Sequence, residues 1–126
     1  MFGNKSRKPV AIQTLIGDDT NIRGDLVFAG GCHVDGVIKG EVRSEKDGQA
    51  FLSISEHGCV EGNVRVPILA LSGTVKGDVH VTERVELGAT ARVDGNVYYN
   101  LIEMTAGAEI NGKLIHNEPH EQTQRL

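Results

Sequence analysis

The sequence predicts an all-β fold: one short parallel β-helix (a β-solenoid) of about six coils, with a disordered tail at each end. Two patterns predict it. A phrase of the form apolar-x-Gly-x-apolar recurs along the chain, and a second apolar position recurs at a set distance before that phrase. The composition agrees, because Val, Ile and Thr are frequent while the chain has 16 Gly, 3 Phe, 2 Tyr and no Trp. Such a chain predicts strands around a narrow aliphatic core.

The repeated phrase sets the length of one coil. It is centred on six glycines at intervals of 16, 22, 15, 18 and 17 residues, namely Gly24, Gly40, Gly62, Gly77, Gly95 and Gly112. The longest interval contains the polar stretch from Ser44 to Ala50, which is typical of a loop inserted in one coil. A glycine at a fixed place in every coil indicates a corner where a Cβ would crowd the neighbouring coil.

The second recurring apolar position agrees with the coil length that the glycine phrase sets. It lies six residues before the first aliphatic residue of a repeat in four places: Phe28 before Val34, Ile54 before Val60, Leu87 before Val93 and Met104 before Ile110. Leu71 lies four residues before Val75, in the shortest repeat, so a two-residue deletion in one turn explains both numbers. A parallel coil requires the same position to be apolar in every turn, because like residues stack about 4.8 Å apart. A hairpin meander does not require this.

Alternation along each strand assigns the two sides of the wall. In the segment 75–81 the odd positions are expected to face inward and the even positions to face water. The aligned repeats place Cys32 in a small inward position and Cys59 in an outward one. The aligned partners are Gly58, Gly73, Ala91 and Ala108 for Cys32, and His33, Thr74, Arg92 and Glu109 for Cys59. We therefore expect a buried Cys32 and an exposed Cys59 thiol, neither of them catalytic.

Composition and motifs argue against several functions. A formal charge of −4 disfavours a dedicated nucleic-acid binder, which usually has a broad basic surface. The two cysteines form neither CxxC nor a zinc-like spacing, so we expect a reduced cytoplasmic setting. The sequence shows no apolar run of membrane-spanning length, no secretory signal and no phosphate-binding Gly loop. We expect no cofactor, no metal and no nucleotide.

The residues also point to a family. The chain resembles the bactofilins over residues 14–115, through the stacked phrases and through "GATARVDGNV" (88–97) and "IEMTAGAEINGKL" (102–114). The resemblance implies a right-handed β-helix that assembles without nucleotide into non-polar filaments or sheets. It also implies attachment to the inner face of the cytoplasmic membrane. The expected partners are other copies of the chain, anionic lipids and peptidoglycan-modifying or morphogenetic proteins.

The two ends of the solenoid are the expected polymerisation surface. A β-helix ends in unpaired backbone, and the polar segment 116–126 offers no amphipathic helix to cover it. The apolar residues of the terminal coils are then the predicted contacts: Leu15, Ile16 and Ile22 at the start, and Ile110, Leu114 and Ile115 at the end. The alternative is that the flanking segments fold over both ends.

The first 13 residues form the predicted N-terminal tail. Phe2 stands beside three cations, Lys5, Arg7 and Lys8, with no acidic residue before Asp18. One apolar anchor with basic neighbours is typical of weak attachment to an anionic membrane, and many bactofilins have a similar membrane-targeting segment. The alternative is a solubilising tail without a membrane function. For the C-terminal tail, 116–126, we expect disorder and no function.

The main alternative function is enzymatic. A coil of this kind also resembles the left-handed β-helix of the hexapeptide-repeat acyltransferases, which rely on a histidine base. His33, His57 and His80 are the candidates here, although their positions on outward strand faces or at a turn favour solvated surface histidines. The sequence lacks the strict six-residue repeat and the acceptor-binding extension of those enzymes. A carbohydrate-binding or lyase β-helix usually has more coils and an aromatic or acidic groove. We therefore expect a scaffold rather than an enzyme.

Overall fold

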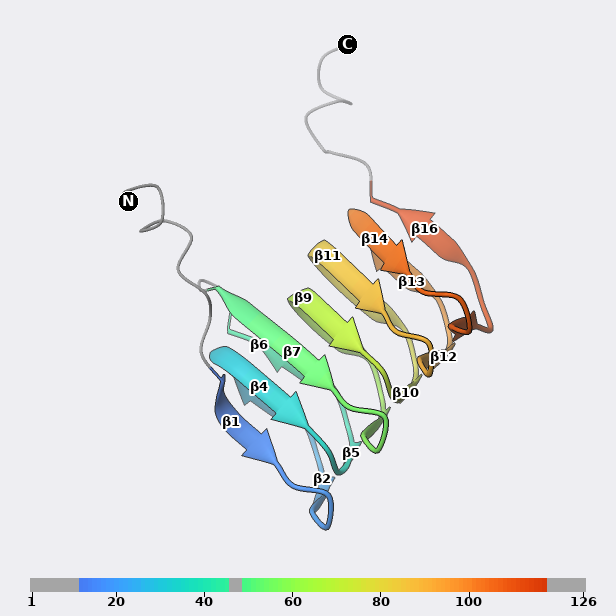
Figure 1. The fold of residues 1–126 in the computed structure, drawn as a ribbon. Helices are drawn as coiled ribbons and strands as arrows, with labels where there is room; N and C mark the ends of the chain where they lie inside the picture. Colours follow the sequence, from blue (N-terminus) through green and yellow to red (C-terminus); the bar gives the residue numbers. More distant parts are fainter. Residues whose placement is uncertain (1–11, 46–48, 118–126) are drawn as a thin grey trace, which may run out of the picture.

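The computed structural model describes residues 12–45 and 49–117, and these residues form a parallel β-solenoid (Figure 1). Within the described ranges every element is a strand, and all paired strands are parallel. The strands wind into six coils, each with three faces. The predicted fold class is confirmed, while the right-handed sense of the coil remains an expectation from the resemblance.

Each coil passes through the first, second and third faces in turn. The first face consists of β1 (Ile12–Ile16), β4 (Gly30–Val34), β7 (Ala50–Ile54), the second halves of β9 (Val64–Leu71) and β11 (Val79–Leu87), and β14 (Leu101–Met104). The second face consists of β2 (Asn21–Arg23), β5 (Val37–Lys39), β8 (Cys59–Glu61), β10 (Thr74–Lys76), β12 (Arg92–Asp94) and β15 (Glu109–Ile110). The third face consists of β3 (Leu26–Phe28), β6 (Val42–Ser44), the first halves of β9 and β11, β13 (Val97–Tyr99) and β16 (Leu114–His116).

The core is a set of aliphatic columns that run the length of the stack. One column passes through Val60, Val75 and Val93 on the second face, and all three side chains are fully buried. The third face has an equivalent column through Val79 and Val97. Among the described residues no polar or charged side chain is buried, so the predicted inward and outward positions of the segment 75–81 are confirmed.

The repeated glycines stack at the corner between the second and third faces. A Cβ on Gly40 would collide with the carbonyl oxygen of Gly24 in the preceding coil, and a Cβ on Gly62 would collide with that of Gly40. The same close approach recurs at the next three glycines of the column, Gly77, Gly95 and Gly112. The backbones of successive coils therefore touch at this corner, which is why the sequence repeats glycine there.

The pairing register corrects the sequence alignment in the second coil. Val34 pairs with Ile54 on the first face, and Ile38 occupies the second-face position beside Val60. The prediction that Val34 occupies the same coil position as Val60 is therefore wrong. The prediction that Phe28 occupies the same position as Ile54 is also wrong, because Phe28 pairs with Ser44 on the third face. The cause is a short turn: only residues 35 and 36 separate β4 from β5, whereas four residues separate β7 from β8. The two-residue deletion thus occurs in two coils.

The same error affects the two cysteines. Cys32 is fully buried as predicted, but it pairs with Leu52 and Thr14 rather than sharing a column with Gly58. Burial raises the pKa of the Cys32 thiol to about 11. Cys59 faces outward and pairs with Thr74, as predicted, yet its side chain is half-buried rather than exposed. His33 does not belong to that column, because it pairs with Ser53 on the first face.

The predicted tails fall mostly outside the described residues. Phe2, Lys5, Arg7 and Lys8 all lie outside them, as do the residues after Asn117. The first described strand begins at Ile12 and the last ends at His116. No helix among the described residues is long and apolar enough to cross a membrane.

Candidate assembly surfaces

The last coil exposes apolar side chains whose counterparts in the inner coils are buried. Leu114 stacks on Val97, which is fully buried, yet Leu114 is 45% exposed. Met104 stacks on Leu87, which is 2% exposed, yet Met104 is 47% exposed. The difference arises because an inner coil is covered from both sides, whereas no described coil follows the last one. At this end the inward-facing side chains of the core are therefore exposed.

The backbone at this end is also unpaired on one side. β14 pairs only with β11, β15 only with β12 and β16 only with β13 among the described strands. Each of these strands therefore presents a row of backbone N–H and C=O groups along the stack axis. Such an edge accepts another strand readily unless it is covered.

The first coil forms the opposite end and is less open. Its strands β1, β2 and β3 pair only with the second coil in the described part of the chain. Two of its inward side chains are nevertheless buried, Ile16 at 8% and Phe28 at 5% exposure, and Ile22 is half-buried. The two ends thus offer different amounts of inward-facing apolar surface, with the larger amount at the last coil.

The six predicted contact residues divide into two groups. Ile22, Ile110 and Leu114 lie in inward columns at the open ends, and Ile16 lies in the same position but is buried. Leu15 and Ile115 occupy outward positions, and Leu15 is 65% exposed. The sequence reasoning omitted Met104 and Ile102 from the last coil. Met104 was already recognised as an apolar repeat position, so the same logic could have assigned it to the end.

A ladder of polar side chains follows the glycine corner. In four of the five steps between described coils, the residue after the glycine accepts a hydrogen bond from the backbone N–H of its counterpart in the next coil: Asp25 from Glu41, Asn63 from Asp78, Asp78 from Asn96, and Asn96 from Lys113, at 2.9–3.0 Å. The ladder ends on Lys113, whose ammonium group cannot accept such a bond. The last coil therefore cannot continue the ladder into an added coil.

The first face carries a small Ser-His-Asp cluster. His33 Nδ1 lies 3.0 Å from Ser53 Oγ, and His33 Nε2 lies 3.1 Å from Asp35 Oδ1. A hydrogen bond from Ser55, together with the nearby His33, holds the pKa of Asp35 below its usual value. Acyl transfer also needs donors aimed at an oxyanion, but the backbone around Ser53 is engaged in pairing with β4 and β9. The cluster instead connects neighbouring coils.

The three candidate histidines do not meet. His33 lies on the first face, His57 is exposed in the turn before β8, and His80 lies on the third face. His80 stacks on Tyr98 with ring centroids 4.4 Å apart, and burial followed by the Arg65 charge lowers its pKa. Within residues 12–45 and 49–117, no three His, Cys, Asp or Glu side chains are grouped as metal ligands.

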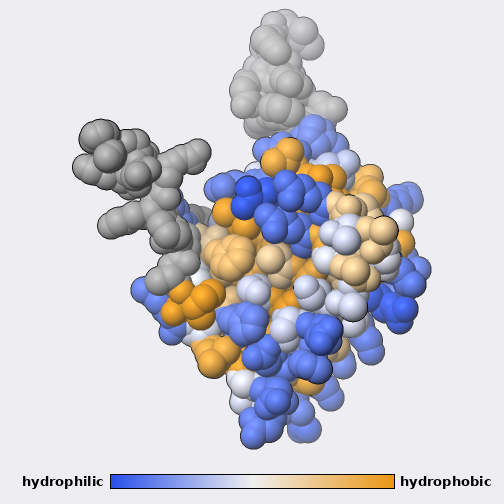
Figure 2. All heavy atoms as spheres, in the orientation of Figure 1, coloured by the Kyte–Doolittle hydropathy of each residue, from blue (hydrophilic) through white to orange (hydrophobic). Residues whose placement is uncertain are grey.

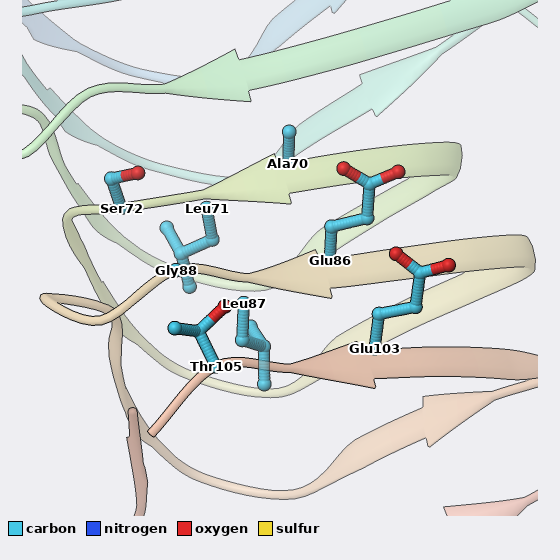
Figure 3. Close-up of a pocket in the computed structure, with 8 residues that line it drawn as sticks. All are labelled: Ala70, Leu71, Ser72, Glu86, Leu87, Gly88, Glu103 and Thr105. Carbon is cyan, nitrogen blue, oxygen red and sulfur yellow. The ribbon is translucent and has the colours of Figure 1, made fainter. Parts of the chain in front are cut away.

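A shallow hollow lies at one end of the first face (Figure 3). It is lined by Ala70, Leu71, Ser72, Glu86, Leu87, Gly88, Glu103 and Thr105. Figure 3 shows Glu86 and Glu103 projecting from neighbouring strands on the same side. Arg84 Nε lies 3.0 Å from Glu86 Oε2, an ion pair without hydrogen-bond geometry. Two stacked carboxylates, Glu86 and Glu103, lie beside one guanidinium, so this end of the face has excess negative charge and the two carboxylates repel each other.

Comparisons with known proteins agree with this architecture. A family model described as "Bactofilin: Polymer-forming cytoskeletal" matches residues 14–115. Bactofilin BacP of Myxococcus xanthus (strain DK1622) is 29% identical over 101 residues, which cover 80% of this chain and 40% of BacP. Bactofilin BacO of the same organism is 24% identical over 108 residues, which cover 86% of this chain and 82% of BacO. The match thus spans less than half of BacP. No solved structure matches this chain significantly.

Proposed function

Because the chain belongs to the bactofilin family of polymer-forming cytoskeletal proteins, we propose that it is a bacterial scaffold whose filaments grow by stacking the ends of the β-helix. The observation that carries this proposal is the open last coil. There Leu114 and Met104 remain about half exposed, although their columns are buried in the inner coils, and three strands have unpaired edges. A second coil placed over them would bury these side chains and pair the open strand edges.

One end-to-end contact between two molecules, called a joint below, has a modest binding free energy. Complete burial of one aliphatic side chain contributes about 1.5–3 kcal/mol, so the exposed halves of Leu114 and Met104 contribute roughly half of that each. Backbone hydrogen bonds between edge strands add to this. Loss of translational and rotational freedom opposes it by at least about 4 kcal/mol. Both surfaces exist in the folded monomer, so assembly requires no nucleotide-driven change of shape.

The polar ladder supports filaments without polarity. If the first coil of one molecule stacked on the last coil of another, the N–H of Asp25 would meet the side chain of Lys113, at a position where four of the five internal steps supply an acceptor. The two ends also differ in exposed apolar surface, with Met104 and Leu114 at one end and a buried Ile16 at the other. If last coils contact last coils and first coils contact first coils, each joint brings together two ends with the same amount of exposed apolar surface. Growth then alternates between two kinds of joint.

The charge distribution supports attachment through the N-terminal tail. The described residues carry 8 Lys and Arg against 14 Asp and Glu, a formal charge of −6, while the whole chain carries −4. An anionic membrane therefore repels the solenoid. Phe2, Lys5, Arg7 and Lys8 supply the attraction, at about 1 kcal/mol for each basic residue near the surface. One tail binds weakly, but the tails of a polymer act together.

In this proposal the filament lies in the cytoplasm on the inner face of the membrane. There it positions peptidoglycan-modifying or other morphogenetic proteins. Negative-stain electron microscopy of the purified chain in plain buffer, with and without ATP or GTP, tests the assembly. We expect filaments of the same appearance in every case. Particles that stay monomeric, or that assemble only with nucleotide, would contradict the proposal.

A further inference from the structure

Apolar side chains gather on the outside of the first face. The outward positions in its middle are uncharged: Phe51 and Ser53 in β7, and Ile68 and Ala70 in β9. Toward the two ends of the stack the outward positions include Ile12, Leu15 and Leu101, which are 49%, 65% and 55% exposed. This face is turned to the viewer in Figure 2, where patches of orange and pale orange interrupt the blue.

The outward positions of the other two faces are different in kind. Those of the second face include Lys39, Glu61, Lys76, Asp94 and Arg92, and those of the third face include Arg43, Arg65 and His80. On the second face charged residues of both signs alternate along one outward column. On the third face Arg43 and Arg65 occupy the second and third coils, and Val27, Tyr98 and Ile115 occupy positions nearer the ends. The first face is thus the one with a central uncharged region in the described solenoid, which is typical of a face that contacts protein.

We propose that two copies of the chain pair through their first faces in antiparallel orientation, so that filaments associate side by side. This inference rests on the proposed end-to-end filament. In this arrangement the first coil of one copy lies over the last coil of the other. Phe51 of one copy then faces Ile68 of the other, and Ile12 faces Leu101. Gly31, which lacks a side chain, faces the long Arg84.

The size of the face explains why the partner is a filament rather than a single chain. Six coils about 4.8 Å apart, with strands of four to five residues at about 3.3 Å each, give a face of roughly 400 Å². Two such faces bury roughly 800 Å² in total, below the 1,200 Å² that stable interfaces usually reach. A single pair is therefore weak. Along two filaments the contact repeats in every subunit, and the combined affinity rises steeply.

The acidic end of the face favours the antiparallel orientation. Glu86 and Glu103 are stacked near the last coil, and among the described residues Arg84 forms its ion pair with Glu86. A parallel pair would bring both copies of these carboxylates to the same level. An antiparallel pair separates the two Glu86 side chains by about three coils, or roughly 14 Å, which exceeds the Debye length of about 8 Å in physiological salt. It also places them over coils whose outward first-face positions are uncharged or histidine.

The face can be tested without disturbing filament growth. In F51K and I68K a lysine replaces a half-buried outward residue of an inner coil, so the core and both ends stay intact. The matched control is V37K, the same type of change at a half-buried outward position of the second face. Electron microscopy and low-speed sedimentation report bundling separately from filament formation. We expect wild-type and V37K filaments to pair and bundle, and F51K and I68K to give single filaments, with at least a tenfold loss of pelleted protein.

The outcomes separate the two proposals. Single filaments in the wild type, or bundles that persist in F51K and I68K, would overturn the pairing of first faces while leaving end-to-end growth intact. Absence of any filament in the wild type would instead overturn the proposed function, and the inference with it.

The orientation has its own test. A double variant, H33C with E86C, in a C59S background places two thiols on the first face about three coils apart, too far for a disulfide within one chain. Antiparallel pairing predicts a disulfide between position 33 of one chain and position 86 of the other after mild oxidation. Peptide mass spectrometry identifies it. Only 33–33 and 86–86 links, or no link between bundled filaments, would refute the antiparallel arrangement.

Discussion

Replacing Leu114 with Arg should abolish filaments while leaving the solenoid folded. Leu114 is 45% exposed in the last coil, so the monomer loses only part of one side chain's burial, about 1 kcal/mol. A joint between two last coils contains two copies of this residue. Each copy loses its burial and places a cation in a desolvated contact, which costs several kcal/mol more. Even a total loss of about 4 kcal/mol lowers the association constant roughly 1,000-fold.

The assay combines two measurements on the same sample. Far-ultraviolet circular dichroism should show the β spectrum of the wild type, and sedimentation velocity should show a monodisperse dimer instead of filaments. The dimer is expected because the joint between first coils is unchanged. The control is V37R, which places the same charge on an outward position of β5 in the second coil, far from the last coil that carries Leu114. Filaments of normal length in L114R would refute the reasoning, and so would their loss in V37R.

Three further predictions concern the core, the tail and the thiols. Val79→Asp should abolish soluble folded protein, because Val79 is fully buried and a lone buried carboxylate costs several kcal/mol. Lys76→Ser, at an exposed outward position of the same segment, should change the urea midpoint little, and equal effects would contradict the inside-outside assignment. Phe2→Glu should release filaments from anionic liposomes without shortening them, and unchanged cosedimentation would exclude the tail as an anchor. A thiol reagent at pH 8 should modify Cys59 slowly and Cys32 only on unfolding, because burial raises the pKa of both thiols, that of Cys32 to about 11. Rapid reaction at two thiols in the folded protein would contradict the structure.

Much of the fold could be predicted from the sequence because a parallel stack requires glycine and aliphatic residues at the same positions in every coil. The glycine corner is an example: a side chain at Gly62 has no room beside Gly40, so the same residue recurs. The second coil could not be assigned correctly in this way. Val34 and Ile38 are both buried aliphatics four residues apart, so either one fits the repeat, and only the pairing with Ile54 distinguishes them.

The candidate surfaces were harder to predict than the fold. The sequence identified both terminal coils, but Leu15 was grouped with the inward contacts although it faces outward. The six-residue spacing before Ile22 already assigns Ile16, and not Leu15, to an inward column. The uncharged middle of the first face was also missed. Phe51 and Ile68 belong to neighbouring coils in space but lie 17 residues apart in sequence, across the turn and the second face.

The central claim, growth by stacking of like ends, is tested most directly by cryo-electron microscopy of the wild-type filament. Stacking along the solenoid axis predicts strands perpendicular to the filament and a spacing of about 4.8 Å along its length. Six coils per subunit give about 29 Å, so alternating joints predict an axial repeat of about 58 Å. A 4.8 Å spacing across the filament instead of along it would contradict end stacking, and a repeat of one subunit would contradict the pairing of like ends.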